Sequence, residues 1–175
     1  MTLNTTFTKE LDVVEKLIKK DLNKEKIISG LYKYIFKSSG KKMRARLSLI
    51  SSSVIKHKDR YKLAAIIELL HTATLVHDDV VDNSPTRRGN KSVNSIWTNS
   101  HGVLIGDYIY SKAFILMVEI GNKNILEELA NATNDISQGE LMQLEAINNT
   151  NITLNKLKKI SYYKTGRLFE ASAKT

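Results

Sequence analysis

Carboxylates and guanidiniums lie close together in the stretch LVHDDVVDNSPTRRG, residues 75–89. Asp78 and Asp82 are four residues apart, so on a helix they lie on one face, about 5–6 Å from each other. Carboxylates at this spacing suit Mg²⁺, which keeps some water ligands and shares the phosphates of its substrate. Arg87 and Arg88 cannot bind a cation, but their forked donors match phosphate or carboxylate. Together these residues predict a site for a metal-chelated polyphosphate.

The alternative for this stretch is an ordinary helix end whose arginines form surface ion pairs. Negative charge at a helix C-terminus opposes the helix dipole and costs a few tenths to about 1 kcal/mol per residue. Because these aspartates lower stability and no local residue compensates for them, they favour the interpretation as a functional site.

A second basic stretch, SSGKKMRAR, covers residues 38–46. Residues 38–40 are expected to form a loop, and Lys41 and Arg44 to open the next helix. Backbone N–H groups at a helix start favour anions. An ordinary basic helix start is the alternative, although cations there run against the helix dipole.

Composition excludes several classes of function. The chain has 175 residues and no cysteine, so disulfides, thiolate catalysis and Cys-ligated metals are excluded. The net charge is +9, but the lysines are scattered and lack interleaved aromatic side chains, which disfavours nucleic-acid binding. The N-terminus lacks the apolar region of a signal peptide, and no apolar run approaches the ~18 residues of a membrane span. A soluble, cytoplasmic protein is expected.

The elements that must position these residues are helices. Apolar residues recur every three or four positions in long runs without proline, and Pro85 is the only proline. This periodicity predicts a single all-α domain over residues 1–175, with a loop at 83–92 and no strand. The predicted helices cover 11–22, 27–35, 41–56, 60–78, a short segment at 94–98, 102–120, 123–147 and 153–173.

Six motifs in order resemble the trans-isoprenyl diphosphate synthases of the polyprenyl synthetase family, from about residue 25 to the C-terminus. They are GKKMRAR, IIELLHTATLVHDDVVD, TRRG, VLIGDYIYSKAF, ISQGELMQLE and YYKTGRLFEASA. The resemblance implies an isoprenoid-synthase-type helical bundle around a deep central cavity, assembled as a homodimer. It also implies a long-chain, octaprenyl-type enzyme.

The reaction implied by the resemblance is Mg²⁺-dependent, head-to-tail condensation of isopentenyl diphosphate with an allylic diphosphate, farnesyl or similar. The product would be membrane-destined, for quinone side chains. Metals and cations would stabilise the departing diphosphate, so no protein nucleophile is needed, and none is visible in the sequence.

The family's site residues map onto positions of this sequence. Asp78 and Asp82 resemble the Mg²⁺ ligands, with Asp79 in support. The other implied roles are allylic diphosphate binding by Arg87, Lys164 and Thr165; isopentenyl diphosphate binding by Lys41, Arg44, His71 and Arg88; support by Asp107 and Gln143; and control of product length by the small residues Ala73 and Thr74.

The sequence also departs from the family pattern. Lys42 and Ala45 replace an arginine and a proline in the first motif. After Asp82 the only aspartates are Asp107 and Asp135, and neither lies in a second DDxxD motif. The chain is therefore expected to be the N-terminal portion of the domain, a truncated bundle. A non-catalytic fragment or subunit is the alternative, but the intact first motif argues against a relative that has lost its metal ligands.

Overall fold

The computed structural model of the chain describes residues 3–20, 25–37, 40–54 and 57–175, and in these ranges it is almost entirely helical. The all-α prediction is confirmed. The helices are α1 (Leu3–Lys19), α2 (Lys26–Ile35), α3 (Met43–Ser53), α4 (Arg60–Val81), α5 (Val93–Ile96), α6 (Asn99–Ile120), α7 (Lys123–Ala146), α8 (Leu154–Ser161), the π-helix η1 (Tyr162–Gly166) and α9 (Arg167–Lys174).

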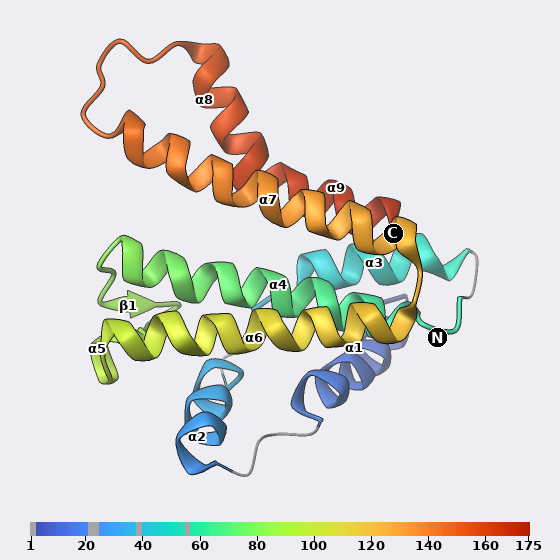
Figure 1. The fold of residues 1–175 in the computed structure, drawn as a ribbon. Coiled ribbons are helices and arrows are strands. Elements are labelled where there is room, and N and C mark those ends of the chain that lie inside the picture. The colour runs from blue at the N-terminus through green and yellow to red at the C-terminus, as the bar shows by residue number, and fades with distance from the viewer. Residues whose placement is uncertain (1–2, 21–24, 38–39, 55–56) are drawn as a thin grey trace.

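The helices form layers around α4 (Figure 1). Helices α4 and α6 run side by side through the centre, with α7 and α9 on one side of them and α1 and α2 on the other. Helix α3 packs against both α4 and α9. This arrangement brings Asp78, near the C-terminal end of α4, within electrostatic range of Glu140 on α7 and Lys164 on η1, which carry the later motifs.

Helix α4 forms the centre of the core because it is apolar around most of its circumference. Every residue from Leu63 to Leu70 is buried, including Glu68. A helix that is hydrophobic all round needs neighbours on several sides, and α1, α3, α6 and α9 all contact it. The side chains at the C-terminal end of α4, Asp78 and Asp82 among them, are therefore carried by a rigid helix.

The end of α4 lies three residues later than the expected Asp78. The helix continues through Val81, and Asp82 is its C-cap. Asn83 then adopts a left-handed conformation at φ 49°, and the Ser84 N–H donates to the Asp79 carbonyl at 2.9 Å. This 6→1 hydrogen bond is a Schellman ending, so both aspartates of the pair belong to the last turn and its cap.

The predicted loop at 83–92 contains a small hairpin. Strands β1 (Thr86–Arg87) and β2 (Asn90–Lys91) pair antiparallel, and Arg88 and Gly89 form the turn with φ 52° and 78°. Positive φ at both central residues is typical of a type I′ turn, which matches the twist of a hairpin. Two-residue strands are too short to show an alternating pattern, so the sequence did not reveal them.

Other boundaries differ by a few residues. Helix α6 begins at Asn99, where the Thr98 hydroxyl caps it, and α3 begins at Met43 after a left-handed Lys42. Asn122 caps α7, since its side chain accepts from the N–H groups of residues 124 and 125. The predicted helix at 153–173 consists of α8, η1 and α9. The expectations for residues 21–22, 38–39 and 55–56 lie outside the described residues.

Within the described ranges, none of the helices combines the length and the apolar character that crossing a membrane requires.

Candidate active site

The last turn of α4 presents the predicted carboxylate pair. The Asp82 N–H donates to the Asp78 carbonyl at 2.8 Å, which confirms that the two residues lie one turn apart. Within the described residues, neither carboxylate has a hydrogen bond or an ion pair. Burial, and then the nearby Glu140 carboxylate, raise the pKa of Asp78 to about 6, although Lys164 and Arg87 act in the opposite direction.

The carboxylates of Asp78 and Asp82 fit a magnesium ion that takes its other ligands from bound phosphate and water. In the described part of the chain no three metal-ligating side chains converge, so the chain offers a carboxylate pair and not a closed protein cage. Mg²⁺ commonly binds in this way, through one or two carboxylates together with substrate phosphates and water. The half-buried Asp78 carboxylate has no hydrogen-bonding partner among the described residues, and a bound cation would satisfy it.

Lys164 lies across from the pair, on η1. Its Nζ atom is 2.8 Å from Gln143 Oε1 and 2.7 Å from Glu140 Oε2. Helix α7 approaches η1 closely here because Gly139 has no side chain: a Cβ atom at Gly139 would lie 2.8 Å from Tyr163 Cβ and 3.0 Å from Lys164 N. The glycine of the ISQGELMQLE motif thus sets the position of Lys164, and the Gln143 side chain accepts a hydrogen bond from it.

Arg87 is directed at Asp79. Its Nε and Nη2 atoms donate to Asp79 Oδ1 at 2.8 and 2.6 Å, and these hydrogen bonds raise the pKa of Arg87. Asp79 is only 5% exposed, and Asn94 donates to its backbone carbonyl at 3.2 Å. The structure therefore gives Asp79 the role of orienting Arg87, on a different face of α4 from the Asp78–Asp82 pair.

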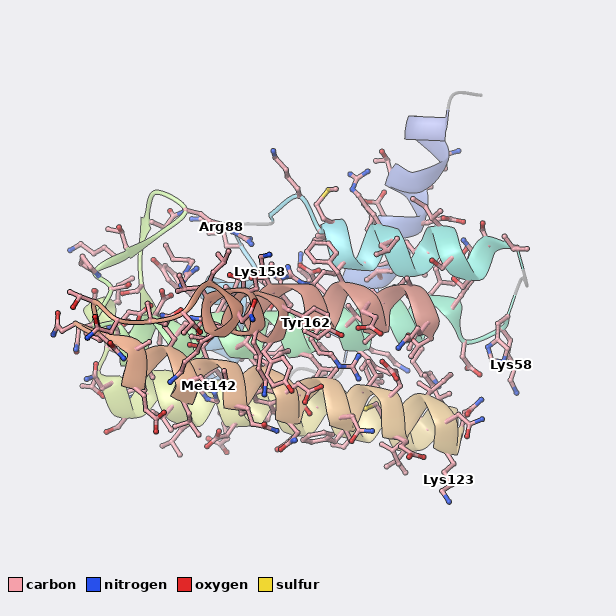
Figure 2. All side chains as sticks on the ribbon, turned by 90° about the horizontal axis from the view of Figure 1, so that it is seen from above. Lys58, Arg88, Lys123, Met142, Lys158 and Tyr162 are labelled. Carbon is pink, nitrogen blue, oxygen red and sulfur yellow. The ribbon has the colours of Figure 1, made fainter. Side chains whose placement is uncertain are left out.

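Arg44 on α3 contacts His71 on α4, and Arg88 is close enough to act on the charge of His71. Arg44 Nη1 is 3.1 Å from His71 Nε2, and Arg88 lies at the turn of the hairpin, near the segment that leads into α3 (Figure 2). Burial, with the positive charges of Arg44, Arg88 and Arg87, lowers the pKa of His71 to about 3. The imidazole is therefore neutral, and it accepts a hydrogen bond from Arg44 while leaving the other arginine donors free for an anion.

Four other predicted residues form no hydrogen bond or ion pair with these groups among the described residues, and a fifth, Thr74, bonds only to the backbone of His71. Lys41 and Thr165 are exposed and have no side-chain hydrogen bond or ion pair to the described residues. Asp107 is also exposed and lies 3.3 Å from His77 on the α6 side. Ala73 is fully buried, and the Thr74 hydroxyl donates to the His71 carbonyl at 2.7 Å. Their proposed roles remain predictions.

Three residues of this region were missed in the sequence. Glu140 binds Lys164, Phe169 lies over Arg44 at 4.2 Å, and the buried Glu68 has a carboxylate oxygen without a hydrogen-bonding partner among the described residues. Burial raises the pKa of Glu68, and the cations Lys42, Arg88 and Arg44 oppose this. Of these three residues, only Glu68 could have been found in the sequence. It is a charged residue inside the apolar run of α4, and charged side chains are rarely buried unless they have a partner.

We expect Gly40→Ala to weaken the binding of a diphosphate at Arg88, where the resemblance implies isopentenyl diphosphate, with little effect on stability. A Cβ atom at Gly40 would lie 2.3 Å from Arg88 Nη1, so the flexible end of Arg88 must move away. The loss of one charge-assisted hydrogen bond corresponds to roughly 10–100-fold in affinity. Calorimetric titration checks this, and Gly30→Ala is the matched control because a Cβ atom there meets nothing within 4 Å. Equal affinities of the variant and the parent would contradict the assignment of Arg88.

We also expect His71 to make the fold less stable in mild acid. Between its folded pKa of about 3 and its unfolded value of about 6.5, only the unfolded chain binds the proton, so stability falls as pH falls. From pH 7 to pH 5 the free energy of unfolding should decrease by about 2 kcal/mol more in the parent than in His71→Gln.

Urea unfolding at both pH values measures this difference. Asp78 titrates in the opposite direction but is present in both proteins, so its contribution cancels. His57→Gln, at an exposed position before α4, is the control and should behave like the parent. A pH dependence that is unchanged in His71→Gln would show that His71 does not cause it.

Comparison with known proteins identifies the family to which this site belongs. Residues 25–175 match the sequence model described as polyprenyl synthetase. The chain is 37% identical to octaprenyl diphosphate synthase of Escherichia coli over 174 residues, which cover 98% of this chain and 54% of that enzyme. It is 40% identical to an all-trans-nonaprenyl-diphosphate synthase of Rhodobacter capsulatus over 153 residues, 85% of this chain and 46% of the relative. The chain belongs to the polyprenyl synthetase family.

Solved structures support the same conclusion. A decaprenyl diphosphate synthase from Rhodobacter capsulatus superimposes with a TM-score of 0.91 at 35% identity, covering 97% of this chain and 53% of that one. A polyprenyl synthase from Caulobacter crescentus, complexed with calcium and isoprenyl diphosphate, also gives a TM-score of 0.91, at 34% identity over 95% of this chain and 52% of that one. The isoprenoid-synthase-type bundle is confirmed, and the chain spans about half the length of the relatives that it matches.

Proposed function

We propose that the chain carries the diphosphate-binding side of a long-chain trans-polyprenyl diphosphate synthase, which condenses isopentenyl diphosphate with an allylic diphosphate. The observation that carries the proposal is the grouping of charges around one end of α4. The carboxylates of Asp78 and Asp82, which form no hydrogen bond or ion pair with the described residues, face Lys164 on η1, while Arg44 on α3 contacts His71 on α4. Two groups of cations flanking one carboxylate pair suit two diphosphates, of which one is chelated to metal.

In this proposal Asp78 and Asp82 hold Mg²⁺ together with the allylic diphosphate. The bound metal supplies electrostatic stabilisation of the leaving diphosphate. Lys164, fixed by Gln143 and Glu140, and Arg87, oriented by Asp79, contribute the positive charges of the chain itself. These groups are preorganised, so they need little rearrangement as negative charge develops on the leaving group.

The second diphosphate, that of isopentenyl diphosphate, is assigned to Arg44, His71, Arg88 and Lys41. The neutral imidazole of His71 holds Arg44 without adding charge. The Caulobacter crescentus relative, which is complexed with calcium and isoprenyl diphosphate, supports a divalent cation and a prenyl diphosphate as the ligands of this fold.

A long, octaprenyl-type product for quinone side chains is the finer part of the proposal. The relatives in the comparison include octaprenyl, nonaprenyl and decaprenyl synthases, and Ala73 and Thr74 lie just upstream of the carboxylate pair. Assembly as a homodimer also belongs to the proposal. It is supported by large apolar side chains exposed along α6, among them Leu104, Ile115 and Val118.

Binding measurements test the proposal without requiring turnover. Calorimetric titration of the 175-residue chain with farnesyl thiodiphosphate, an analogue that ionises slowly, should show binding that depends on Mg²⁺. A separate titration with isopentenyl diphosphate should show binding that does not require the metal. The absence of both would overturn the proposal.

A second candidate is that the chain is a non-catalytic fragment or subunit of such a synthase. It is favoured by the sequence, which has one DDxxD motif where the family pattern has two. We therefore expect no multiple turnover when the purified chain is incubated with labelled isopentenyl diphosphate, farnesyl diphosphate and Mg²⁺. Repeated turnover by the chain alone would exclude this candidate and show that another group replaces the second motif.

A further inference from the structure

The aromatic ring of Phe169, on α9, lies over the guanidinium of Arg44. The distance from Arg44 Cζ to the ring centroid is 4.2 Å, well within the ~6 Å range of a cation–π interaction. On another side, Arg44 Nη1 is 3.1 Å from His71 Nε2. Arg44 Nε is buried and has no hydrogen-bonding partner in the described part of the chain. Among the described residues, the ring and the imidazole are thus in contact with the guanidinium, and the buried Glu68 carboxylate acts on its charge from a greater distance.

A ring beside a guanidinium differs from a carboxylate partner in what it leaves free. The Phe169 ring attracts the Arg44 charge through its π face, with Cζ 4.2 Å from the centroid, and has no oxygen to accept the five N–H donors. An acidic partner would occupy those donors and neutralise the charge. Phe169 can therefore hold Arg44 in place and still leave it available to an anion.

The position of Phe169 follows from the helix that carries it. Helix α9 continues directly from η1, with residues 166 and 167 in right-handed helical conformation, and it packs against α3, which carries Arg44 (Figure 1). Lys164 lies on the same continuous segment, five residues before Phe169. One segment thus contacts both proposed diphosphate sites, directly through Lys164 and indirectly through Phe169.

We propose that Phe169 is a positioning residue for isopentenyl diphosphate, acting through the orientation of Arg44. This inference rests on the proposed function, because it takes Arg44 to be a phosphate ligand. It predicts that loss of the ring weakens binding at the Arg44 site and leaves binding at the Asp78–Asp82 site unchanged.

The test is calorimetric titration of the 175-residue chain with isopentenyl diphosphate, and separately with farnesyl thiodiphosphate and Mg²⁺. Phe169→Leu should weaken isopentenyl diphosphate binding roughly 3–30-fold, the range expected from the strength of a cation–π contact. Its affinity for the allylic analogue should stay the same. Phe169→Tyr retains a ring and should restore most of the lost affinity, whereas Phe169→Met, which fills a similar space without a ring, should not.

A matched control removes a similar contact elsewhere. The guanidinium of Arg60 lies 5.0 Å from the ring of Tyr61, at the other end of α4, so Tyr61→Leu should leave both affinities unchanged. A double substitution adds a second criterion: in a chain that already carries Arg44→Gln, Phe169→Leu should have no further effect on isopentenyl diphosphate binding. If the Phe169→Leu variant does not fold, the Phe169→Met variant, whose flexible side chain fills a similar space, replaces it in the titrations.

The outcomes separate the inference from the proposed function. If Phe169→Leu binds isopentenyl diphosphate as tightly as the parent, or if it loses both ligands equally, the inference is overturned while the proposed function stands. If the parent chain binds neither ligand, the proposed function fails and the inference fails with it.

Discussion

Asp78→Asn should remove Mg²⁺-dependent binding of an allylic diphosphate, with an affinity loss of roughly 10²–10³-fold, the size expected when a preorganised electrostatic group is lost. The substitution keeps the shape of the side chain but removes its charge. One remaining carboxylate, Asp82, is exposed at the helix cap and cannot replace the half-buried Asp78. Calorimetric titration with farnesyl thiodiphosphate, with and without Mg²⁺, measures the effect.

The control for this experiment is Asp12→Asn, which removes a carboxylate from an exposed position on α1 and should leave the affinity unchanged. Binding of isopentenyl diphosphate by Asp78→Asn should also be retained, because Arg44 and His71 are untouched. If Asp78→Asn keeps the metal-dependent affinity of the parent, Asp78 is not a magnesium ligand.

Arg167→Met should lower the free energy of unfolding by about 3 kcal/mol, at the lower end of the range for breaking a buried ion pair. Arg167 is 7% exposed, and its Nε and Nη1 atoms donate to Asp135 at 2.8 Å and to Glu128 at 2.5 Å. Burial alone would lower the pKa of Arg167, but these hydrogen bonds more than offset it and raise the pKa. Without the arginine, two partly buried carboxylates on α7 lose their partner.

Urea unfolding measures this loss, and a triple variant distinguishes its cause. When Glu128→Gln and Asp135→Asn are added to Arg167→Met, no unpaired charge remains, so part of the lost stability should return. A triple variant less stable than Arg167→Met would show that the loss comes from the packing of the arginine stem. Affinity for the two diphosphates provides a check that the site itself is intact.

Local spacing was sufficient to predict the carboxylate pair and most of the helices. The i, i+4 relation of Asp78 and Asp82 depends only on the helix that contains them, and the apolar residues of α4 made that helix clear. The pairs Arg44–His71 and Lys164–Gln143 join separate helices. The family resemblance grouped Arg44 with His71, but it gave Gln143 only a supporting role and did not link it to Lys164; spacing alone predicted neither pair.

The remaining features depend on packing between distant segments. Asp79 was expected to support the metal site, but the hairpin directs Arg87 toward it, and no local pattern specifies that hairpin. Glu140 and Phe169 have roles only because α7 and α9 pass close to Lys164 and Arg44. The end of α4 was misplaced by three residues because a left-handed Asn83, and not a proline or glycine, terminates it.

The π-helix η1 has a consequence for how the length of this chain can vary during evolution. A π-turn contains one residue more than an α-turn, and each helical residue corresponds to a rotation of about 100°. Deleting a single residue from Tyr162–Gly166 would therefore rotate the following helix relative to Lys164 and turn Phe169 away from Arg44. The connection between α7 and α8, residues 147–153, has no such constraint, because it lies outside both helices. Insertions and deletions among natural variants should accordingly accumulate in that connection, while the number of residues from Lys164 to Phe169 stays constant.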